Sequence, residues 1–283
     1  MNMFGTDKNV KAAVVGYPTV QSLSPAMHNA VFHHQNLHST YVAVDVTAAN
    51  FAEMLNDARA CGLRGLSITM PHKEIAFASM DKCDVRALDA QSVNTVVFED
   101  NGQMFGTNTD GDGACAALVD GGAVLQGARC VILGAGATAR SIILSLARNG
   151  AVDIAVVNRS PENARSAATL VAQARIGSFD DVASASILIN ATSVGMGSLE
   201  SPLDQDCFHP KLTVLDVVYF PLETTFLHAA REAGAVAVDG LDMLAHQAAL
   251  QQLAWFGSLP DARVMRSAAL EELRRRSHLG GNK

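Results

Sequence analysis

The sequence predicts an α/β fold with two domains, each built on its own β-sheet. At 283 residues the chain is longer than one hydrophobic core usually supports. Short β-branched runs alternate with longer alanine-rich helical stretches, which is typical of βαβ units and mostly parallel sheets. Hydrophobic residues make up 49% and charged residues 17%, a composition that supplies two apolar cores and excludes a disordered chain.

The first domain is expected to hold residues 1–110 together with 243–283. Its strands are expected at 12–15, 41–46, 66–68, 93–98 and 104–107, and its first helices at 25–35 and 48–61. Pro71 suits the first turn of a third helix, where its missing N–H is no loss. The last two strands flank Asp100-Asn101-Gly102, which predicts a hairpin turn. The closing helices, 241–256 and 261–276, are expected to pack back onto this domain.

The second domain is expected over residues 111–242, as an independent βαβ series. It begins with a helix at 111–120 and has a further helix at 163–174. Five strands are expected, at 130–133, 154–157, 187–189, 214–216 and 236–238. Parallel strands with crossover helices are typical of a nucleotide-binding sheet.

Charge and cysteine content exclude several classes of protein. The net charge is −7 and the 21 Lys and Arg are scattered, so we expect no nucleic-acid partner. The one basic run, Arg274 to Arg276, follows two glutamates near a helix end, where cations complement the helix dipole; a binding patch is the alternative. The five cysteines lack metal-binding spacing, so no metal site is expected.

No segment of the chain has the pattern of a membrane span or a targeting signal. Residues 1–10 lack a basic patch followed by an apolar run, and no apolar stretch of about 18 residues occurs. We therefore expect a cytoplasmic protein with reduced thiols and no membrane partner.

A glycine-containing loop follows the strand at 130–133 and opens a helix. It reads Gly134-Ala135-Gly136-Ala137-Thr138, with apolar helical positions beyond it. Glycine at 134 permits the tight turn from strand to helix, and Gly136 lets the backbone approach a pyrophosphate at the helix N-terminus. This context predicts a Rossmann-type dinucleotide site, against the alternative of a tight turn without a ligand.

The end of the second strand indicates which dinucleotide binds. An NAD site usually has Asp or Glu there, but this strand ends in Asn158-Arg159-Ser160. A guanidinium at Arg159, and Arg140 across the loop, would donate charge-assisted hydrogen bonds to a 2′-phosphate. NADP(H) is therefore predicted, with NAD(H) as a secondary possibility. In the alternative interpretation Arg159 only covers the sheet edge.

Three polar clusters precede the nucleotide-binding domain. Ser22 and Ser24 could bind a carboxylate from a helix N-terminus, although Ser24 is also a good N-cap with Pro25 after it. Lys73, four residues after Thr69, opposes the helix dipole at a cost of about 0.3–1 kcal/mol, which favours a functional lysine over a surface one. Asp110 follows the hairpin and is either an N-cap or a carboxylate in a cleft.

Taken in order, these segments resemble the shikimate dehydrogenase family. The shared segments are S-x-S-P-x-x-H-N from Ser22, T-x-P-x-K from Thr69, V-N-T around Asn94, N-T-D-G ending at Gly111, the G-A-G loop, N-R-S, Asn190 to Met196, and Gly240 to Gln247. The resemblance implies NADPH-linked, reversible reduction of 3-dehydroshikimate to shikimate. It also implies a split substrate domain whose last helices return from the C-terminus.

The resemblance also implies roles for individual residues. Ser22 and Ser24 would hold the substrate carboxylate with Tyr219 nearby, and Thr69, Asn94 and Gln247 would bind the hydroxyls. Lys73 and Asp110 would form the proton-transfer pair. The cofactor residues would be Gly134, Ala135, Gly136, Ala137, Thr138, Asn158, Arg159, Ser160, Val217 and Gly240.

Three positions depart from the family pattern: Ser67 in place of a common Asn, Gln91-Ser92 in place of Gly-Ala, and Asn163 in place of a basic residue. The first two lie beside the expected substrate residues. A quinate/shikimate or aminoshikimate dehydrogenase with relaxed NAD/NADP use therefore stays an alternative. A non-catalytic NADP-binding sensor is another, although such a protein would not need both Lys73 and Asp110. A monomer or a homodimer is expected.

Overall fold

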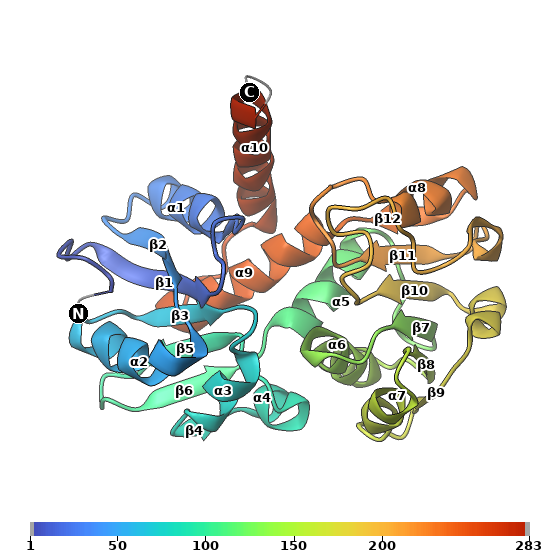
Figure 1. Cartoon of the computed structure of the whole chain (residues 1–283), viewed down its shortest axis with the longest axis horizontal. Coiled ribbons are helices and arrows are strands. Elements are labelled where there is room, and N and C mark those ends of the chain that lie inside the picture. The colour runs from blue at the N-terminus through green and yellow to red at the C-terminus, as the bar shows by residue number, and fades with distance from the viewer. Residues whose placement is uncertain (1–2, 281–283) are drawn as a thin grey trace. The chain divides into compact units, whose positions relative to one another are not determined.

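The computed structural model describes residues 3–280, which form two compact units (Figure 1). The first unit runs to Thr109 and resumes at Ala248; the second covers Asp110–Gln247. Residues 1–2 and 281–283, the outer ends of the expected first domain, lie outside the described residues. Each unit contains a six-stranded sheet, so the predicted α/β fold with two sheets is confirmed.

The first unit has a mixed sheet in the order β2-β1-β3-β5-β6-β4. Its elements are β1 (Val10–Gly16), α1 (Ser24–His34), β2 (Thr40–Asp45), the 3₁₀ turn η1 (Ala48–Asn50), α2 (Phe51–Ala60), β3 (Gly65–Ile68), α3 (Lys73–Ala78), β4 (Lys82–Cys83), α4 (Val85–Ala90), β5 (Thr95–Phe98), β6 (Met104–Thr107) and α10 (Ala262–Gly280). The strands β1, β2 and β3 are parallel, and β5 pairs antiparallel with both β3 and β6. The hairpin predicted at Asp100 to Gly102 is confirmed, with Gly102 at φ 85°.

Alternate residues of β1 face different layers of this unit. Ala13 and Val15 pack with α2, α3 and α4, whereas Ala12 and Val14 pack with Phe32 of α1 and with Trp255. Figure 1 shows α1 and α2 on opposite sides of β1 and β3. Helices on both faces explain why the strand reads as a continuous apolar run.

The second unit has an all-parallel sheet in the order β12-β11-β10-β7-β8-β9. Its elements are α5 (Asp110–Asp120), β7 (Arg129–Leu133), α6 (Ala137–Arg148), β8 (Asp153–Val157), α7 (Pro161–Ala168), β9 (Ala174–Ile176), η2 (Phe179–Ser184), β10 (Ile187–Asn190), η3 (Gln205–Cys207), β11 (Thr213–Asp216), α8 (Thr225–Glu232), β12 (Val236–Val238) and the start of α9 (Gly240–Phe256). Counted from β7, the order is 6-5-4-1-2-3, which is that of the Rossmann fold.

Both faces of the second sheet are covered by apolar side chains. Helices α5 and α6 contribute to the core that contains Ile132 and Ile189, and α8 contributes to the opposite core with Val131 and Leu188. The order of strands reverses between β7 and β10, and ligands of open α/β sheets bind beyond the strand ends at such a point. Among the described helices, none is long and apolar enough to cross a membrane.

Two predicted elements of the chain were wrong in part. The helix expected at 163–174 ends at Ala168, because the chain turns there and forms β9, a sixth strand where five were expected. This strand is a short sheet edge with exposed Arg175 and Ile176, so no apolar pattern marks it. Pro71 precedes α3 instead of lying in its first turn, because His72 N–H closes a turn onto the Thr69 carbonyl at 3.0 Å.

The sequence interpretation missed α4, although the helix has clear end signals. Asp84 is its N-cap and accepts a hydrogen bond from Ala87 N–H at 3.0 Å. Gln91 ends the helix in the left-handed conformation, at φ 50° and ψ 42°. An L-residue pays about 1–2 kcal/mol for that conformation, which explains why glycine is favourable at this position.

We predict that Gln91→Gly stabilises the protein. Removing the Cβ relieves the left-handed conformation, and the extra flexibility of glycine in the unfolded chain offsets part of this gain. The net gain is about 0.5–1 kcal/mol, which raises the melting temperature by roughly 1–4 °C. Gln91→Ala keeps the Cβ and is the control, with no gain expected. A glycine variant that melts at or below the wild-type temperature would contradict this account.

Candidate active site

Backbone hydrogen bonds bring three of the expected site residues together in the first unit. Thr69 follows β3 and its N–H donates to the Val15 carbonyl at 2.9 Å. Ile68 N–H donates to the Asn94 carbonyl at 2.7 Å, and Val93 N–H donates to the Lys73 carbonyl at 3.0 Å. Thr69, Lys73 and Asn94 therefore lie side by side where β3 ends and β5 begins.

Hydrogen bonds within the first unit hold the side chain of Asn94 in one orientation. Its Oδ1 accepts from Thr95 Oγ1 at 2.7 Å and from Thr109 N–H at 2.9 Å, and its Nδ2 donates to Thr109 Oγ1 at 2.9 Å. The side chain is only 2% exposed, so these bonds act in a region of low dielectric and fix the amide firmly.

A second set of buried polar groups lies behind Asn94. Tyr41 O–H donates to Ser67 Oγ at 2.6 Å, and Ser67 O–H donates to Gln251 Oε1 at 2.7 Å. The amide nitrogen of Gln251 in α9 donates to the Asn94 carbonyl and to Thr95 Oγ1, both at 3.1 Å. Burial raises the pKa of Tyr41, while hydrogen bonds to Ser67 and Ser24 lower it, so the phenol stays protonated.

The sequence interpretation missed Tyr41 and Gln251. Tyr41 reads as an ordinary strand residue, and Gln251 as a polar position on an amphipathic helix. The signal that could have identified Gln251 is its place among apolar neighbours of α9, because a buried amide needs hydrogen-bond partners.

Ser22 and Ser24 lie at the start of α1, but not as expected for a helix cap. The helix begins at Ser24 itself after Leu23, so the interpretation of Ser24 as N-cap is wrong. Ser22 Oγ accepts from Ser24 N–H at 3.2 Å, and Ser24 is 6% exposed. A hydroxyl that accepts one bond still has its proton to donate, which suits recognition of an anion.

Two buried histidines lie in the segments that carry the expected substrate residues: His28 in S-x-S-P-x-x-H-N and His72 in T-x-P-x-K. His28 stacks on Tyr41 with ring centroids 4.2 Å apart, and Gln252 lies 2.9 Å from its Nδ1. Burial lowers the pKa of His28 to about 3, so its ring is neutral at physiological pH. His72 Nε2 contacts the Val46 carbonyl. Both rings therefore support the strands and helices around the site.

The second unit begins with Asp110, the first residue of α5. Asp110 is 5% exposed and lies in the helix's first turn, where the helix dipole favours a carboxylate. The glycine that follows in the N-T-D-G motif, Gly111, is required by close packing. A Cβ there would lie 2.1 Å from the Ser141 carbonyl oxygen of α6. Gly111 N–H also donates to Ser141 Oγ at 3.0 Å. The close packing of α5 on α6 thus fixes Asp110.

The glycine loop after β7 has the geometry of a dinucleotide site. Gly134 adopts φ 115°, and a Cβ there would lie 2.8 Å from the Ala191 carbonyl oxygen. Gly136 precedes the N-terminus of α6, and no atom lies within 4 Å of the position that its Cβ would take. Gly134 is therefore required by the turn, whereas Gly136 leaves open space over the helix N-terminus, where backbone N–H groups favour an anion.

The residues after β8 lie beside this loop. Gly134 N–H donates to the Val157 carbonyl at 2.8 Å, which places Asn158 to Ser160 next to the turn. Ser160 is the N-cap of α7 and accepts from Asn163 N–H at 3.3 Å, so its hydroxyl has a structural role. Arg159 is exposed at the strand end.

The remaining expected residues of the second unit come from the loop after β11 and from α9. A Cβ on Gly240 would lie 2.7 Å from the Val217 carbonyl oxygen, so glycine permits a close approach of these two expected cofactor residues. Tyr219 is half-buried in the same loop. Gln247 is 7% exposed, and its amide donates to the Leu244 carbonyl at 2.9 Å.

Asp216 is a further buried polar residue that the sequence interpretation did not identify. Its carboxylate accepts from Asn190 Nδ2 at 2.9 Å, Val218 N–H at 3.0 Å and Thr224 Oγ1 at 2.7 Å. Burial raises the pKa of Asp216 to about 6, although these three hydrogen bonds lower it. Asp216 thereby joins the ends of β10 and β11 to the start of α8.

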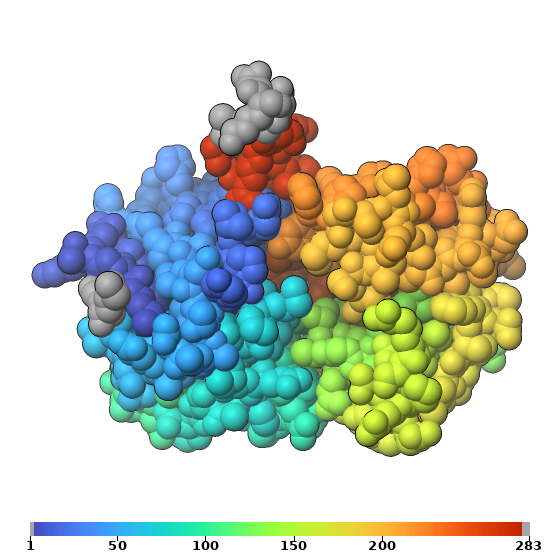
Figure 2. All heavy atoms as spheres, viewed as in Figure 1, coloured from blue at the N-terminus to red at the C-terminus, as the bar shows by residue number. Residues whose placement is uncertain are grey.

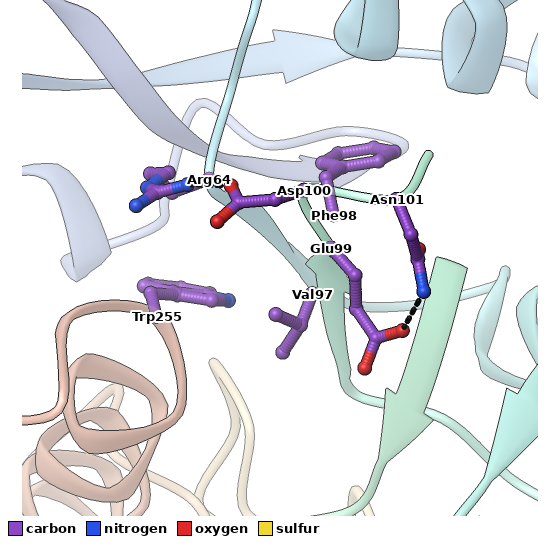
Figure 3. A pocket seen from close by; sticks show the side chains of 7 residues that line it. All are labelled: Arg64, Val97, Phe98, Glu99, Asp100, Asn101 and Trp255. Atoms are coloured by element: carbon purple, nitrogen blue, oxygen red, sulfur yellow. Dashed lines mark hydrogen bonds and ion pairs between the residues drawn. The ribbon is translucent and has the colours of Figure 1, made fainter. Parts of the chain in front are cut away.

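The first unit also contains a surface pocket of about 490 Å³ (Figure 3). It is lined by Arg64, Val97, Phe98, Glu99, Asp100, Asn101 and Trp255. Gly65 pairs with Val97 at this end of the β3–β5 ladder, whereas Ser67 pairs with Thr95 at the other end, next to Thr69 and Asn94. Arg64 and Asp100 form an exposed ion pair at 2.8 Å. The pocket is therefore not part of the candidate site.

Comparisons with known proteins agree with the two sheets and their motifs. Family models match three segments: the shikimate dehydrogenase substrate binding domain at residues 14–96, shikimate / quinate 5-dehydrogenase at 118–201, and the shikimate 5′-dehydrogenase C-terminal domain at 240–270. A shikimate dehydrogenase (NADP(+)) of Thermococcus kodakarensis is 39% identical over 268 residues, covering 91% of this chain and 95% of the relative.

Solved structures show the same similarity. Shikimate 5-dehydrogenase from Thermus thermophilus, in complex with NADP(H) and shikimate, has a TM-score of 0.88 and 36% identity, covering 93% of this chain and 99% of that chain. The 5-ketofructose reductase of a Gluconobacter species has a TM-score of 0.85 and 30% identity, covering 94% and 99%. With this identity across nearly its whole length, the chain belongs to the shikimate dehydrogenase family.

Proposed function

We propose that this protein catalyses the reversible NADPH-dependent reduction of 3-dehydroshikimate to shikimate, a step in aromatic amino acid biosynthesis. The observation that carries the proposal is the similarity over more than nine-tenths of the chain to a relative named for this activity. The local structure also supports the proposal, because Thr69, Lys73 and Asn94 lie side by side at one end of the first sheet.

The first unit is proposed to contribute most of the residues that bind the substrate. Ser22 and Ser24 would hold its carboxylate from the start of α1, with Tyr219 contributing a phenol, and Thr69, Asn94 and Gln247 would bind its hydroxyls. The fixed amide of Asn94 supports this assignment, because a preorganised group loses little entropy when a ligand binds. We propose domain limits of 1–110 plus 243–283 for substrate binding and 111–242 for the cofactor.

The second unit is proposed to bind NADP(H), which supplies or accepts the hydride when bound. The pyrophosphate would lie over Gly134 to Thr138, where Gly136 leaves open space. Asn158, Arg159 and Ser160 would hold the 2′-phosphate end, because Arg159 is exposed beside the glycine loop and no acid stands there. Val217 and Gly240 would lie by the nicotinamide. NAD(H) is a secondary cofactor in this proposal.

Lys73 and Asp110 are proposed as the acid/base pair. Hydride transfer to a ketone leaves an alkoxide, which needs a proton as its charge develops. The Lys73 ammonium can donate this proton, and the Asp110 carboxylate can keep the amine charged. In the direction of shikimate oxidation the same residues accept the proton.

We also propose that the protein acts in the cytoplasm as a monomer or homodimer, without a nucleic-acid or membrane partner. The net charge of −7 and the scattered basic residues support the part of this proposal that concerns nucleic acid.

We predict that Lys73→Ala lowers kcat by roughly 10²–10⁴-fold, because general acid catalysis contributes a factor of that size. The dissociation constant of NADP should not change, since Lys73 lies in the unit proposed to bind substrate. Steady-state kinetics and NADP titration of the purified variant check both parts. Near-normal turnover would remove Lys73 from the mechanism.

We predict that Gly136→Val weakens NADP binding roughly tenfold or more, corresponding to about 1.4 kcal/mol. Gly136 is the N-cap of α6, where valine is less favourable than glycine, so a small loss of stability is expected as well. The space over Gly136 accepts a side chain in the protein alone but not with a pyrophosphate against the backbone. Gly134→Ala is the matched contrast and should lower the melting temperature, because φ is 115° there and the Ala191 carbonyl is close. Unchanged NADP binding by Gly136→Val would place the cofactor elsewhere.

A substrate panel tests the proposed function as a whole. Shikimate, quinate and aminoshikimate are each assayed with NADP and with NAD, and 5-ketofructose with NADPH and NADH, by following reduced-cofactor absorbance. Shikimate with NADP should give the highest kcat/KM. A higher value for quinate or aminoshikimate would favour the alternative enzymes, and no turnover with any pair would favour an NADP-binding sensor.

A further inference from the structure

The basic run near the C-terminus does more than end a helix. Helix α10 continues to Gly280, four residues beyond Arg276. Arg276 Nε donates to Glu272 Oε1 at 2.7 Å, one turn earlier in the helix. Its two remaining nitrogens point away from the helix: Nη1 donates to the Gln21 carbonyl and Nη2 to the Ser22 carbonyl, both at 3.0 Å. A planar guanidinium can make these three contacts at once.

These contacts join parts of the first unit that are 254 and 255 residues apart in sequence. Figure 2 shows the red surface of α10 against the blue surface of the N-terminal segment. The ion pair between Arg276 and Glu272 lies within α10. Arg275 of the same helix also binds Glu272, at 2.7 and 2.8 Å, and so helps to fix the position of this carboxylate. Hydrogen bonds from Arg275 and Arg276 lower the pKa of Glu272 to about 2, so the pair persists at physiological pH.

The loop before α1 is held at both ends, and the residue between these ends is exposed. At one end Thr19 N–H and Oγ1 both donate to Asp45 Oδ1 at 2.6 Å. Val20, in the middle, is 72% exposed. At the other end Arg276 holds the carbonyls of Gln21 and Ser22, immediately before the Ser22 hydroxyl that accepts from Ser24 N–H.

We propose that Arg276 is a positioning residue for recognition of the substrate carboxylate. By fixing the peptide groups at Gln21 and Ser22, it sets the direction of the Ser22 side chain and keeps this hydroxyl beside that of Ser24. This inference rests on the proposed function, which assigns both serines to the carboxylate. The Glu272 carboxylate is shared by Arg275 and Arg276, so the two arginines carry the same kind of charge beside it, but only Arg276 contacts the two carbonyls. The role assigned to Arg276 is therefore geometric.

The test compares Arg276→Ala with Arg275→Ala. We expect Arg276→Ala to raise the KM for shikimate by roughly 5–30-fold, which corresponds to about 1–2 kcal/mol. The kcat should stay within about twofold of wild type, and the KM for NADP should not change. Arg275→Ala removes the same charge and a contact to the same glutamate, but it touches neither carbonyl; its KM for shikimate should remain at the wild-type value.

Two further measurements separate positioning from charge and from general destabilisation. Arg276→Lys keeps the charge but cannot donate to two carbonyls in a planar fork, so it should also raise the KM for shikimate. The methyl ester of shikimate lacks the carboxylate charge, so the preference of the enzyme for the acid over the ester should fall in Arg276→Ala by the same factor. A merely destabilised variant would keep this preference.

The outcomes distinguish this inference from the proposed function. If the wild-type protein does not oxidise shikimate with NADP, the proposed function fails. If it does, and Arg276→Ala keeps a wild-type KM for shikimate or an unchanged acid-to-ester preference, only the role of Arg276 is wrong. Full rescue by Arg276→Lys, or an equal effect of Arg275→Ala, would also overturn it, because charge would then be sufficient. Should Arg276→Ala fail to fold, Arg276→Lys and its acid-to-ester preference decide.

Discussion

The Ser67 hydroxyl is the buried contact on which the candidate site in the first unit depends most. It accepts from Tyr41 of β2 and donates to Gln251 of α9, two residues that are far apart in sequence. Gln251 in turn binds the Asn94 carbonyl, beside which Thr69 and Lys73 lie. Each such bond contributes about 0.5–1.5 kcal/mol, but a buried partner left unsatisfied costs about 1–3 kcal/mol. The hydrogen bonds among Tyr41, Ser67 and Gln251 therefore favour a single arrangement. In this arrangement Gln251 binds the Asn94 carbonyl and the Thr95 hydroxyl that donates to the Asn94 amide.

The C-terminal helices have a common effect on this unit. Gln251 in α9 fixes groups behind Asn94, and Arg276 in α10 fixes the loop that carries Ser22. Both act on backbone carbonyls, whose direction follows the path of the chain. The last part of the sequence thus completes a site whose candidate substrate residues come mostly from the first 110 residues.

The second unit depends on close backbone approaches instead. Gly111, Gly134 and Gly240 each have a carbonyl oxygen where a Cβ would stand. These contacts hold the start of α5, the glycine loop and the start of α9 against their neighbours. At Gly136 the corresponding position is open space. This difference separates glycines that the fold requires from one that a ligand would require.

The sequence by itself determined the α/β class, the family, the positions of most strands along the chain and the glycine loop. Apolar runs between helical stretches mark strands locally, and the loop glycines are recognisable from their neighbours. The sequence interpretation missed α4, because Val85–Ala90 is too short to show a helical period even though Asp84 is a good cap, and it missed β9, because that edge strand is exposed. The turn that contains Pro71 was also misassigned, because a hydrogen bond from His72 to Thr69 forms it.

Only the tertiary structure decided how individual polar residues are used. The sequence left Ser24 between cap and anion site, and the start of α1 at Ser24 excludes the cap. It left Arg274 to Arg276 as a helix end or a patch, and the contacts of Arg276 with Gln21 and Ser22 show a third use. The physical reason is that local pattern records which residues are buried or helical, whereas a hydrogen bond needs two groups within about 3 Å. For Tyr41, Ser67, Gln251 and Arg276, those partners are brought together only by folding.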